Sequence, residues 1–185
     1  MGTDRLPPLP ESSLSPAQKR AAAELATGPR GAVFGPFVPL LRSPDFLSPL
    51  QKAGEYLRYK SALPPRLSEF AILLVARRWN QQYEWHVHRP IAERAGVPAD
   101  HVQAVAEGRR PDGMAPDQAA VHDFLQELQA NRSVSDVTYG RAVELFGERG
   151  VIDLCGICGY YSTLAMVMNV ARTPLPAGVE PPLAT

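Results

Sequence analysis

The sequence predicts an all-α fold, and three observations support this prediction. Helix-start signals recur, as in Ser15-Pro16-Ala17-Gln18, where Ser15 can cap the helix and Gln18 can close a capping box. No segment alternates apolar and polar residues with a period of two, and no strands alternate with helices. Two long apolar runs, at 70–76 and 154–171, are typical of helices buried inside a bundle.

Proline, glycine and capping residues then predict each helix in chain order. Ser48-Pro49 repeats the first start signal, Pro64-Pro65 separates two helices, and Ser133 opens a late one. The segment 28–44, rich in Gly and Pro, is interpreted as an apolar loop with one short helix, either a lid over a pocket or a contact with a neighbouring subunit. The expected helices span 16–27, 48–61, 65–79, 82–95, 99–107, 116–130, 134–146 and 151–171.

A chain of 185 residues has the length of one domain. Prolines concentrate at its two ends, where they prevent regular helix or sheet. We therefore expect a proline-rich arm over 1–14, a single helical domain over 15–172 and a proline-rich tail over 173–185. Such arms either move freely or lie across a neighbouring subunit.

Composition excludes several classes of protein. The chain has 19 Lys plus Arg and 19 Asp plus Glu, a balance that argues against a nucleic-acid-binding protein. It has no Gly-rich phosphate loop, dinucleotide fingerprint, HExxH motif or nucleophile elbow. Residues 1–15 lack the apolar core of a signal peptide, so we expect a cytoplasmic protein. Sixteen of the 19 basic residues are Arg, which suits a GC-rich genome, and we expect a bacterial protein.

The uncharged run 154–171 is almost long enough for a membrane span. It contains Tyr160, Tyr161 and Asn169, however, and no basic flank on one side only. We expect no membrane segment but a helix covered by the core on one face and by a partner subunit on the other, with Gly156 and Gly159 permitting close approach.

The densest polar cluster is Tyr83-Glu84-Trp85-His86-Val87-His88. On a helix, Glu84 and His88 share a face, and a carboxylate beside an imidazole forms an acid–base pair. An ordinary exposed helix pair is the alternative interpretation. His86 and His88 would share a face only on a strand, so the helical surroundings argue against a metal site.

Glu69 begins the apolar run and shares its helix face with apolar residues, so its carboxylate needs a partner. Arg66 or the helix N-terminus is one possibility. The other is His88, because two antiparallel helices joined near Asn80 would bring the start of one close to the end of the next. We predict that Glu69, Glu84 and His88 converge in one pocket lined by Trp85 or Tyr83.

The remaining cysteines and histidines have ordinary structural interpretations. Cys155 and Cys158 form a CxxC inside an apolar helix and away from basic residues, so they are expected to be buried structural thiols rather than a redox pair. His101 and His122 lie in short polar helices and are expected at the surface.

A set of segments over about 54–176 resembles the carboxymuconolactone decarboxylase family. In order, they are Arg66-Leu67-Ser68-Glu69, the apolar run that ends at Arg77, Tyr83-Glu84-Trp85-x-x-His88, Gly159-Tyr160-Tyr161, Asn169 and Leu175-Pro176. The resemblance implies an alkylhydroperoxidase D-like helical bundle, oligomeric as a trimer or hexamer, with pockets near subunit contacts.

The family has two branches with different motif residues, and the residues of this chain resemble one branch more than the other. The alkylhydroperoxidase D type uses a glutamate, a CxxC pair and a histidine, and the matching places here hold Glu69, Gln81, Glu84 and His88. Both cysteines are absent, so a dithiol peroxidase is not expected. The other branch is a cofactor-free decarboxylase with a Glu–aromatic–x–x–His motif, which Glu84-Trp85-x-x-His88 resembles.

The resemblance therefore implies a cofactor-independent lyase of aromatic catabolism, without metal, acting on a small carboxylated lactone or related acid. His88 would donate the proton and Glu84 would hold its tautomer, with Glu69 as a further partner or alternate proton carrier. Arg77 or Arg78 would bind the substrate carboxylate or lactone oxygen, and Tyr83 and Trp85 would wall the pocket. A non-catalytic, oligomeric small-molecule-binding protein of the same fold is the alternative.

Overall fold

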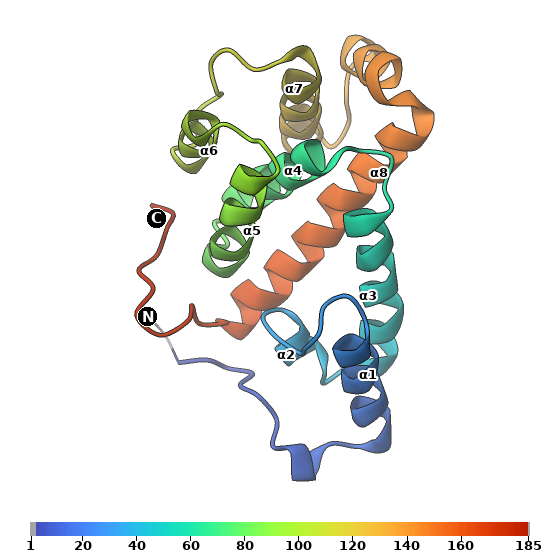
Figure 1. The fold of residues 1–185 in the computed structure, drawn as a ribbon, viewed down its shortest axis with the longest axis vertical. Helices are drawn as coiled ribbons and strands as arrows, with labels where there is room; N and C mark the ends of the chain where they lie inside the picture. The colour runs from blue at the N-terminus through green and yellow to red at the C-terminus, as the bar shows by residue number, and fades with distance from the viewer. Residues whose placement is uncertain (1–2, 185) are drawn as a thin grey trace.

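The computed structural model describes residues 3–184, and all regular secondary structure in that range is helical (Figure 1). This confirms the all-α prediction. A short 3-10 turn at Glu11–Ser13 precedes the α-helices. The helices are α1 (Pro16–Thr27), α2 (Phe37–Leu40), α3 (Pro44–Tyr59), α4 (Pro65–Arg78), α5 (Gln82–Arg94), α6 (Ala99–Ala106), α7 (Pro116–Asn131) and α8 (Asp136–Ala171).

The helix starts follow the predicted capping chemistry, with one boundary displaced. The Ser15 hydroxyl accepts a hydrogen bond from the Gln18 amide, and the Gln18 side chain accepts one from the Ser15 amide, which completes the capping box of α1. Helix α3 begins at Pro44 rather than at residue 48. Pro44 supplies a first-turn proline of its own, and Pro49 is accommodated inside the helix at the cost of one hydrogen bond.

The last two expected helices form one element with a break. Helix α8 runs over Asp136–Ala171, but Gly147 inside it has φ 66° and ψ 170°. A positive φ of this kind is readily adopted by glycine and disfavoured for residues with a Cβ. The two helices expected at 134–146 and 151–171 therefore meet directly at Gly147. The residues 147–150, expected to form a loop between them, are part of α8.

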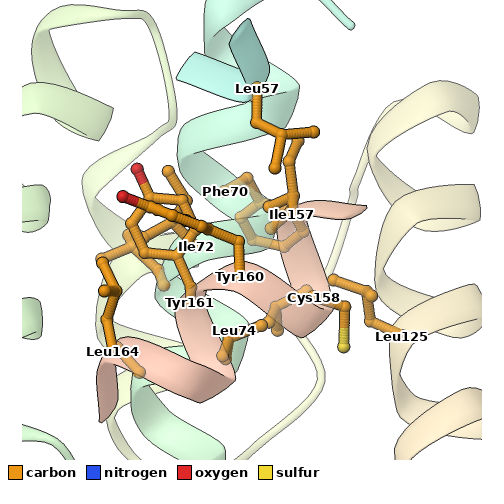
Figure 2. Packing of buried hydrophobic residues seen from close by; sticks show 14 of the residues in the cluster. Leu57, Phe70, Ile72, Leu74, Leu125, Ile157, Cys158, Tyr160, Tyr161 and Leu164 are labelled. Carbon is orange, nitrogen blue, oxygen red and sulfur yellow. The ribbon is translucent and has the colours of Figure 1, made fainter. Parts of the chain in front are cut away.

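Helix α4 is at the centre of the bundle, in contact with α5, α6, α7 and α8. Its apolar run 70–76 is almost completely buried, as the sequence predicts. Figure 2 shows Phe70, Ile72 and Leu74 of this run packed against Ile157 and Leu164 and their neighbours on α8. Burial of two apolar helices against each other thus supplies the main hydrophobic core.

Within residues 3–184, α8 is the one helix that is long and apolar enough to cross a membrane. Its most apolar window has a mean hydropathy of 1.5, and 56% of that window is buried inside the fold. Core helices of soluble proteins meet the same criterion of length and composition, so the observation is weak evidence for a membrane span.

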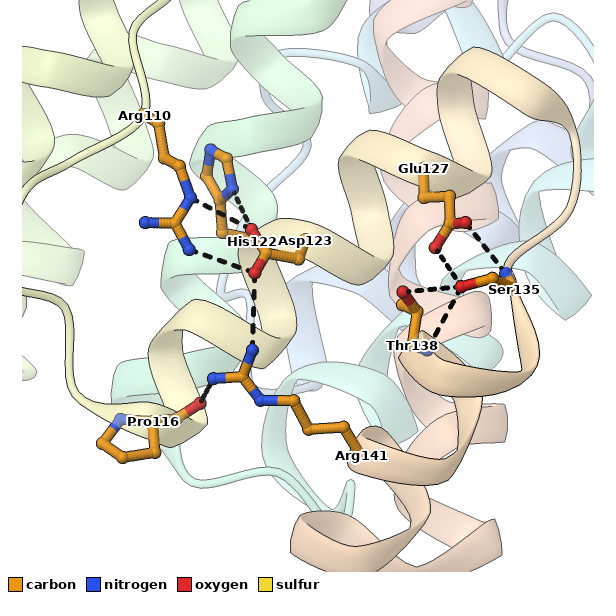
Figure 3. A network of polar contacts seen from close by, with 8 residues as sticks. All are labelled: Arg110, Pro116, His122, Asp123, Glu127, Ser135, Thr138 and Arg141. Carbon is orange, nitrogen blue, oxygen red and sulfur yellow. Dashed lines mark hydrogen bonds and ion pairs between the residues drawn. The ribbon is translucent and has the colours of Figure 1, made fainter.

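The prediction that His101 and His122 lie at the surface is wrong, because both are buried. His101 Nδ1 contacts the Gln118 side chain at 3.2 Å. His122 Nδ1 contacts Asp123, whose carboxylate also pairs with Arg110 and Arg141 (Figure 3). Gln118 contacts His101 from another helix, and Arg110 and Arg141 reach Asp123 from outside α7, so short polar sequences do not reveal these surroundings.

The two proline-rich ends lie against their own chain, and neither moves freely. The Arg5 amide donates to the Ala171 carbonyl, and Arg42 donates to the carbonyls of Leu6 and Pro7. In the tail, the Gln82 side-chain amide pairs with both backbone groups of Leu183, a residue that is 2% exposed. Hydrogen bonds to carbonyls that proline leaves free thus hold extended segments in place.

Candidate active site

A buried acid–base pair joins α4 to α5. The Glu69 Oε2 lies 2.7 Å from His88 Nδ1, and both side chains are 7% exposed. The other proposed partner of Glu69 is occupied elsewhere, because Arg66 pairs with Asp117. A carboxylate that accepts from Nδ1 places the proton on that nitrogen and leaves Nε2 as the second reactive position.

The turn between the two helices sets this pairing. Asn80 adopts φ 47°, a left-handed conformation that asparagine tolerates better than most residues. The Gln81 side chain then caps α5 by accepting from the amides of Tyr83 and Glu84. Its amide group also donates to Asn169 of α8, so the position of α5 is fixed against two neighbouring helices.

Glu84 lies one helical turn before His88 and has a different environment from Glu69. It is 3% exposed, and its Oε2 is buried without a hydrogen-bond partner within the described chain. Burial raises the pKa of Glu84 well above its ordinary value, because an apolar environment favours the neutral acid. Glu84 is thus suited to donate a hydrogen bond or a proton.

The expected roles of the two glutamates are therefore exchanged. The sequence predicts that Glu84 holds the His88 tautomer, yet the structure gives that contact to Glu69. Shared spacing on one helix face permits the Glu84–His88 contact but does not require it. The packing of α4 against α5 brings the Glu69 carboxylate closer to the ring.

Glu84 and His88 line one pocket, whose empty space of about 370 Å³ includes its opening to solvent. The Tyr161 ring packs edge-on against the His88 ring, with centroids 5.1 Å apart. Burial also raises the pKa of Tyr161 well above its ordinary value, so its hydroxyl stays neutral. The full lining consists of Arg30, Phe34, Pro36, Phe37, Arg58, Tyr83, Glu84, Val87, His88, Tyr161, Leu164 and Met168.

Two arginines that sequence reasoning missed supply positive charge to this pocket. Arg30 donates to the Tyr160 hydroxyl at 3.0 Å, and its guanidinium lies 4.5 Å from the centre of the Phe37 ring. Its Nε is buried without a partner in the described chain. Arg58, from α3, lines the same pocket. No motif marks either residue, because they are distant from His88 in the sequence.

Arg30 and Phe37 belong to the segment 28–44, which contains the short helix α2 as expected. Four residues of this segment line the pocket. Its interpretation as a cover over a pocket therefore agrees with the structure. Gly35, with φ 52°, is tightly enclosed, since a Cβ there would lie 2.6 Å from the Tyr83 ring.

Arg77 and Arg78, the expected substrate-binding residues, do not line this pocket. Both line a separate hollow beside α6. Arg77 follows Glu69 by eight residues, or about 12 Å along the helix axis, and Arg78 lies about 180° around the helix from Glu69. Tyr83 lines the pocket of Glu84 and His88 as expected, whereas Trp85 is fully buried and is not among its lining residues.

No group of three or more His, Cys, Asp and Glu residues arranged to hold a metal ion occurs within residues 3–184. The prediction that both cysteines are buried is wrong for Cys155, which is exposed, whereas Cys158 is buried as expected. Neither cysteine lines the pocket. Partial desolvation and the neighbouring Cys158 raise the pKa of the Cys155 thiol, which disfavours the reactive thiolate.

The comparison with protein families matches residues 44–127 to the carboxymuconolactone decarboxylase family. This segment contains Glu84 and His88, which line the pocket, and Glu69, which does not line it but contacts His88 from behind. This part of the chain is therefore similar to the carboxymuconolactone decarboxylase family.

A solved structure confirms that the likeness extends through the fold. The alkylhydroperoxidase AhpD core of an uncharacterized peroxidase-related protein from Ralstonia eutropha JMP134 has a TM-score of 0.76 and 18% sequence identity to this chain. The match covers 96% of this chain and 95% of that chain, so the alkylhydroperoxidase D-like fold is shown. No curated protein matches the sequence.

The raised pKa of the buried Glu84 carboxyl group predicts an effect of pH on stability. The folded-state pKa of Glu84 is raised above its ordinary value of 4.5, so stability is fully present below the unfolded-state pKa and is lost as the pH rises towards the folded-state pKa. The substitution Glu84→Gln replaces the ionisable carboxyl group with a neutral amide, so the variant does not lose stability in this way as the pH rises. We expect the free energy of unfolding of Glu84→Gln to rise relative to wild type between about pH 4 and pH 8.

Urea unfolding of both proteins across this pH range measures the difference. Glu148→Gln is the matched control, because Glu148 is exposed and the same substitution should leave the pH dependence unchanged. A gap between wild type and Glu84→Gln that does not vary with pH would contradict the assignment of Glu84 as a neutral acid.

Proposed function

We propose that this protein is a cofactor-independent lyase of the carboxymuconolactone decarboxylase type. The observation that carries the proposal is the convergence of three groups on one pocket: the Glu69–His88 pair, the unpartnered Glu84 carboxyl group and two arginines. Together they provide a proton donor, a neutral hydrogen-bond donor and positive charge for an anionic substrate.

The proposed reaction removes carbon dioxide from a small carboxylated lactone or related acid. Arg30 and Arg58 orient the anionic substrate, since guanidinium groups bind oxyanions in a fork. When the carbon–carbon bond breaks, carbon dioxide leaves and its bonding electrons remain on the substrate as a dienolate. The neutral carboxyl group of Glu84 donates a hydrogen bond to the dienolate oxygen, where negative charge develops.

His88 then completes the reaction by general acid catalysis. Its Nε2 delivers a proton to the dienolate carbon, while Nδ1–H remains hydrogen-bonded to Glu69, whose negative charge stabilises the imidazolium before transfer. Tyr83, Phe37 and Leu164 line the pocket and exclude water that would compete for the proton. The new C–H bond takes the electron pair released by decarboxylation, so atoms and charge balance.

The direct test is incubation of the protein with 4-carboxymuconolactone while carbon dioxide release and ultraviolet absorbance are followed. Turnover supports the lyase. Binding without turnover, measured by calorimetry, supports the alternative of a non-catalytic small-molecule-binding protein. Dithiol peroxidase chemistry is disfavoured by the absence of any cysteine from the pocket lining, and we expect a cytoplasmic role in bacterial aromatic catabolism.

We also propose that the protein is a homo-oligomer, a trimer or hexamer, that uses one face of α8. Ile152, Met166 and Val170 are 70%, 42% and 64% exposed. With Cys155 and Gly159, they fall within about 60° around the helix, on the face away from the core. Such an apolar stripe is costly to leave in water and marks an interaction site.

Ile152→Glu tests the oligomer proposal. A charge placed in an apolar interface loses its hydration, so we expect the mass measured by light scattering to fall to that of a smaller species. Val137→Glu is the matched control, because Val137 is 83% exposed on α8 but precedes the break at Gly147. A monomeric wild type, or an equal effect of both substitutions, would count against this interface.

A further inference from the structure

A second hollow, separate from the catalytic pocket, lies where α4, α6 and α7 meet. Its empty space, including its opening to solvent, is about 640 Å³, and it shares no lining residue with the catalytic pocket. Its lining consists of Leu74, Arg77, Arg78, Val105, Gly108, Arg109 and Gln126.

The side chains that line this hollow carry strong positive charge, although the chain as a whole has no net charge. Three of its seven lining residues are arginines, and none is an aspartate or glutamate. Glu107 pairs with Arg109 from outside the lining, so two guanidinium charges remain without a counter-ion at the hollow. In water this arrangement is unfavourable, since like charges are brought together without compensation.

Arg77 supplies the second observation. Its Nε–H is buried and has no hydrogen-bond partner within residues 3–184. Its one hydrogen bond from the guanidinium, to the Asn80 side chain, is long at 3.4 Å. The guanidinium lies against Gly108, where an added Cβ would be 3.6 Å from Nη2. A buried donor without a partner is rare in native proteins.

We propose that this hollow binds a small oxyanion, either a phosphate or a carboxylate group of a small molecule. An oxyanion in the hollow would pair with the guanidinium groups of Arg77 and Arg78, and it would accept from the buried Nε–H of Arg77 once that side chain turns towards the hollow. A guanidinium offers two parallel N–H groups to such a ligand. The apolar side chains of Leu74 and Val105 would contact the rest of the molecule.

The experiment follows the Arg77 Nε–Hε signal by nitrogen–proton NMR during titration with inorganic phosphate and, separately, with malonate. Arg77→Lys removes the signal and so assigns it. We expect a saturable shift with one or both anions, and the tighter ligand identifies the class. Sodium chloride at matched ionic strength should not reproduce the shift.

Substitutions separate specific binding from a general effect of charge. We expect Arg78→Gln to weaken the anion about tenfold or more, because a charge-assisted hydrogen bond is lost. Arg20→Gln, an exposed arginine of α1, should leave the affinity unchanged. Absence of a shift with both anions, or equal weakening by both substitutions, would overturn the proposal, and neither result depends on turnover at the catalytic pocket.

Discussion

Replacement of His88 by alanine should reduce turnover of 4-carboxymuconolactone by about 10²–10⁴-fold, the usual contribution of a general acid. His88 is the one imidazole in the pocket lining, and its Nδ1 is already held by Glu69. Without the ring, the dienolate must take its proton from the small amount of water that reaches the pocket. Steady-state kinetics on the purified variant measures the loss.

The control for this substitution is His86→Ala. His86 lies two residues away on α5, is partly exposed and does not line the pocket, so the same change should leave turnover close to that of wild type. Glu69→Gln should also lower turnover, because a neutral amide cannot stabilise the imidazolium through charge. If His88→Ala retains wild-type turnover with its helical spectrum intact, the proposed acid is wrong.

Replacement of Gly54 by alanine should destabilise the fold by about 1–3 kcal/mol, the usual cost of overpacking a core. A Cβ at Gly54 would lie 2.0 Å from the Tyr160 ring and 2.1 Å from its hydroxyl. Tyr160 is 5% exposed, and burial raises its pKa to about 12. The ring must therefore move, and Arg30 loses its hydrogen-bond acceptor in the pocket.

Urea unfolding of Gly54→Ala measures this destabilisation, and Gly140→Ala is the matched control. Gly140 lies in α8 with nothing within 4 Å of an added Cβ, so alanine there should stabilise the helix by up to about 1 kcal/mol. Opposite signs for the two glycines would support close packing at Tyr160. A stabilising effect at both positions would contradict it.

Much of the fold was determined by local sequence. Capping residues such as Ser15 and the prolines at helix starts act within one turn, so their effect can be predicted without knowing the rest of the chain. The apolar run 70–76 likewise had to be buried whatever covered it. Placing Glu69 at the start of this run and His88 near the end of the next helix made their contact geometrically allowed.

The tertiary structure alone decided which charged groups share the pocket. Arg30 and Arg58 come from segments distant from His88, and the packing of α2 and α3 against α8 brings them to the pocket that α5 also lines. Arg77, near in sequence, is directed to another hollow by the rotation of α4. Local patterns specify which face of a helix is apolar, but the partner of each polar group depends on how the helices pack, because those contacts join residues far apart in the chain.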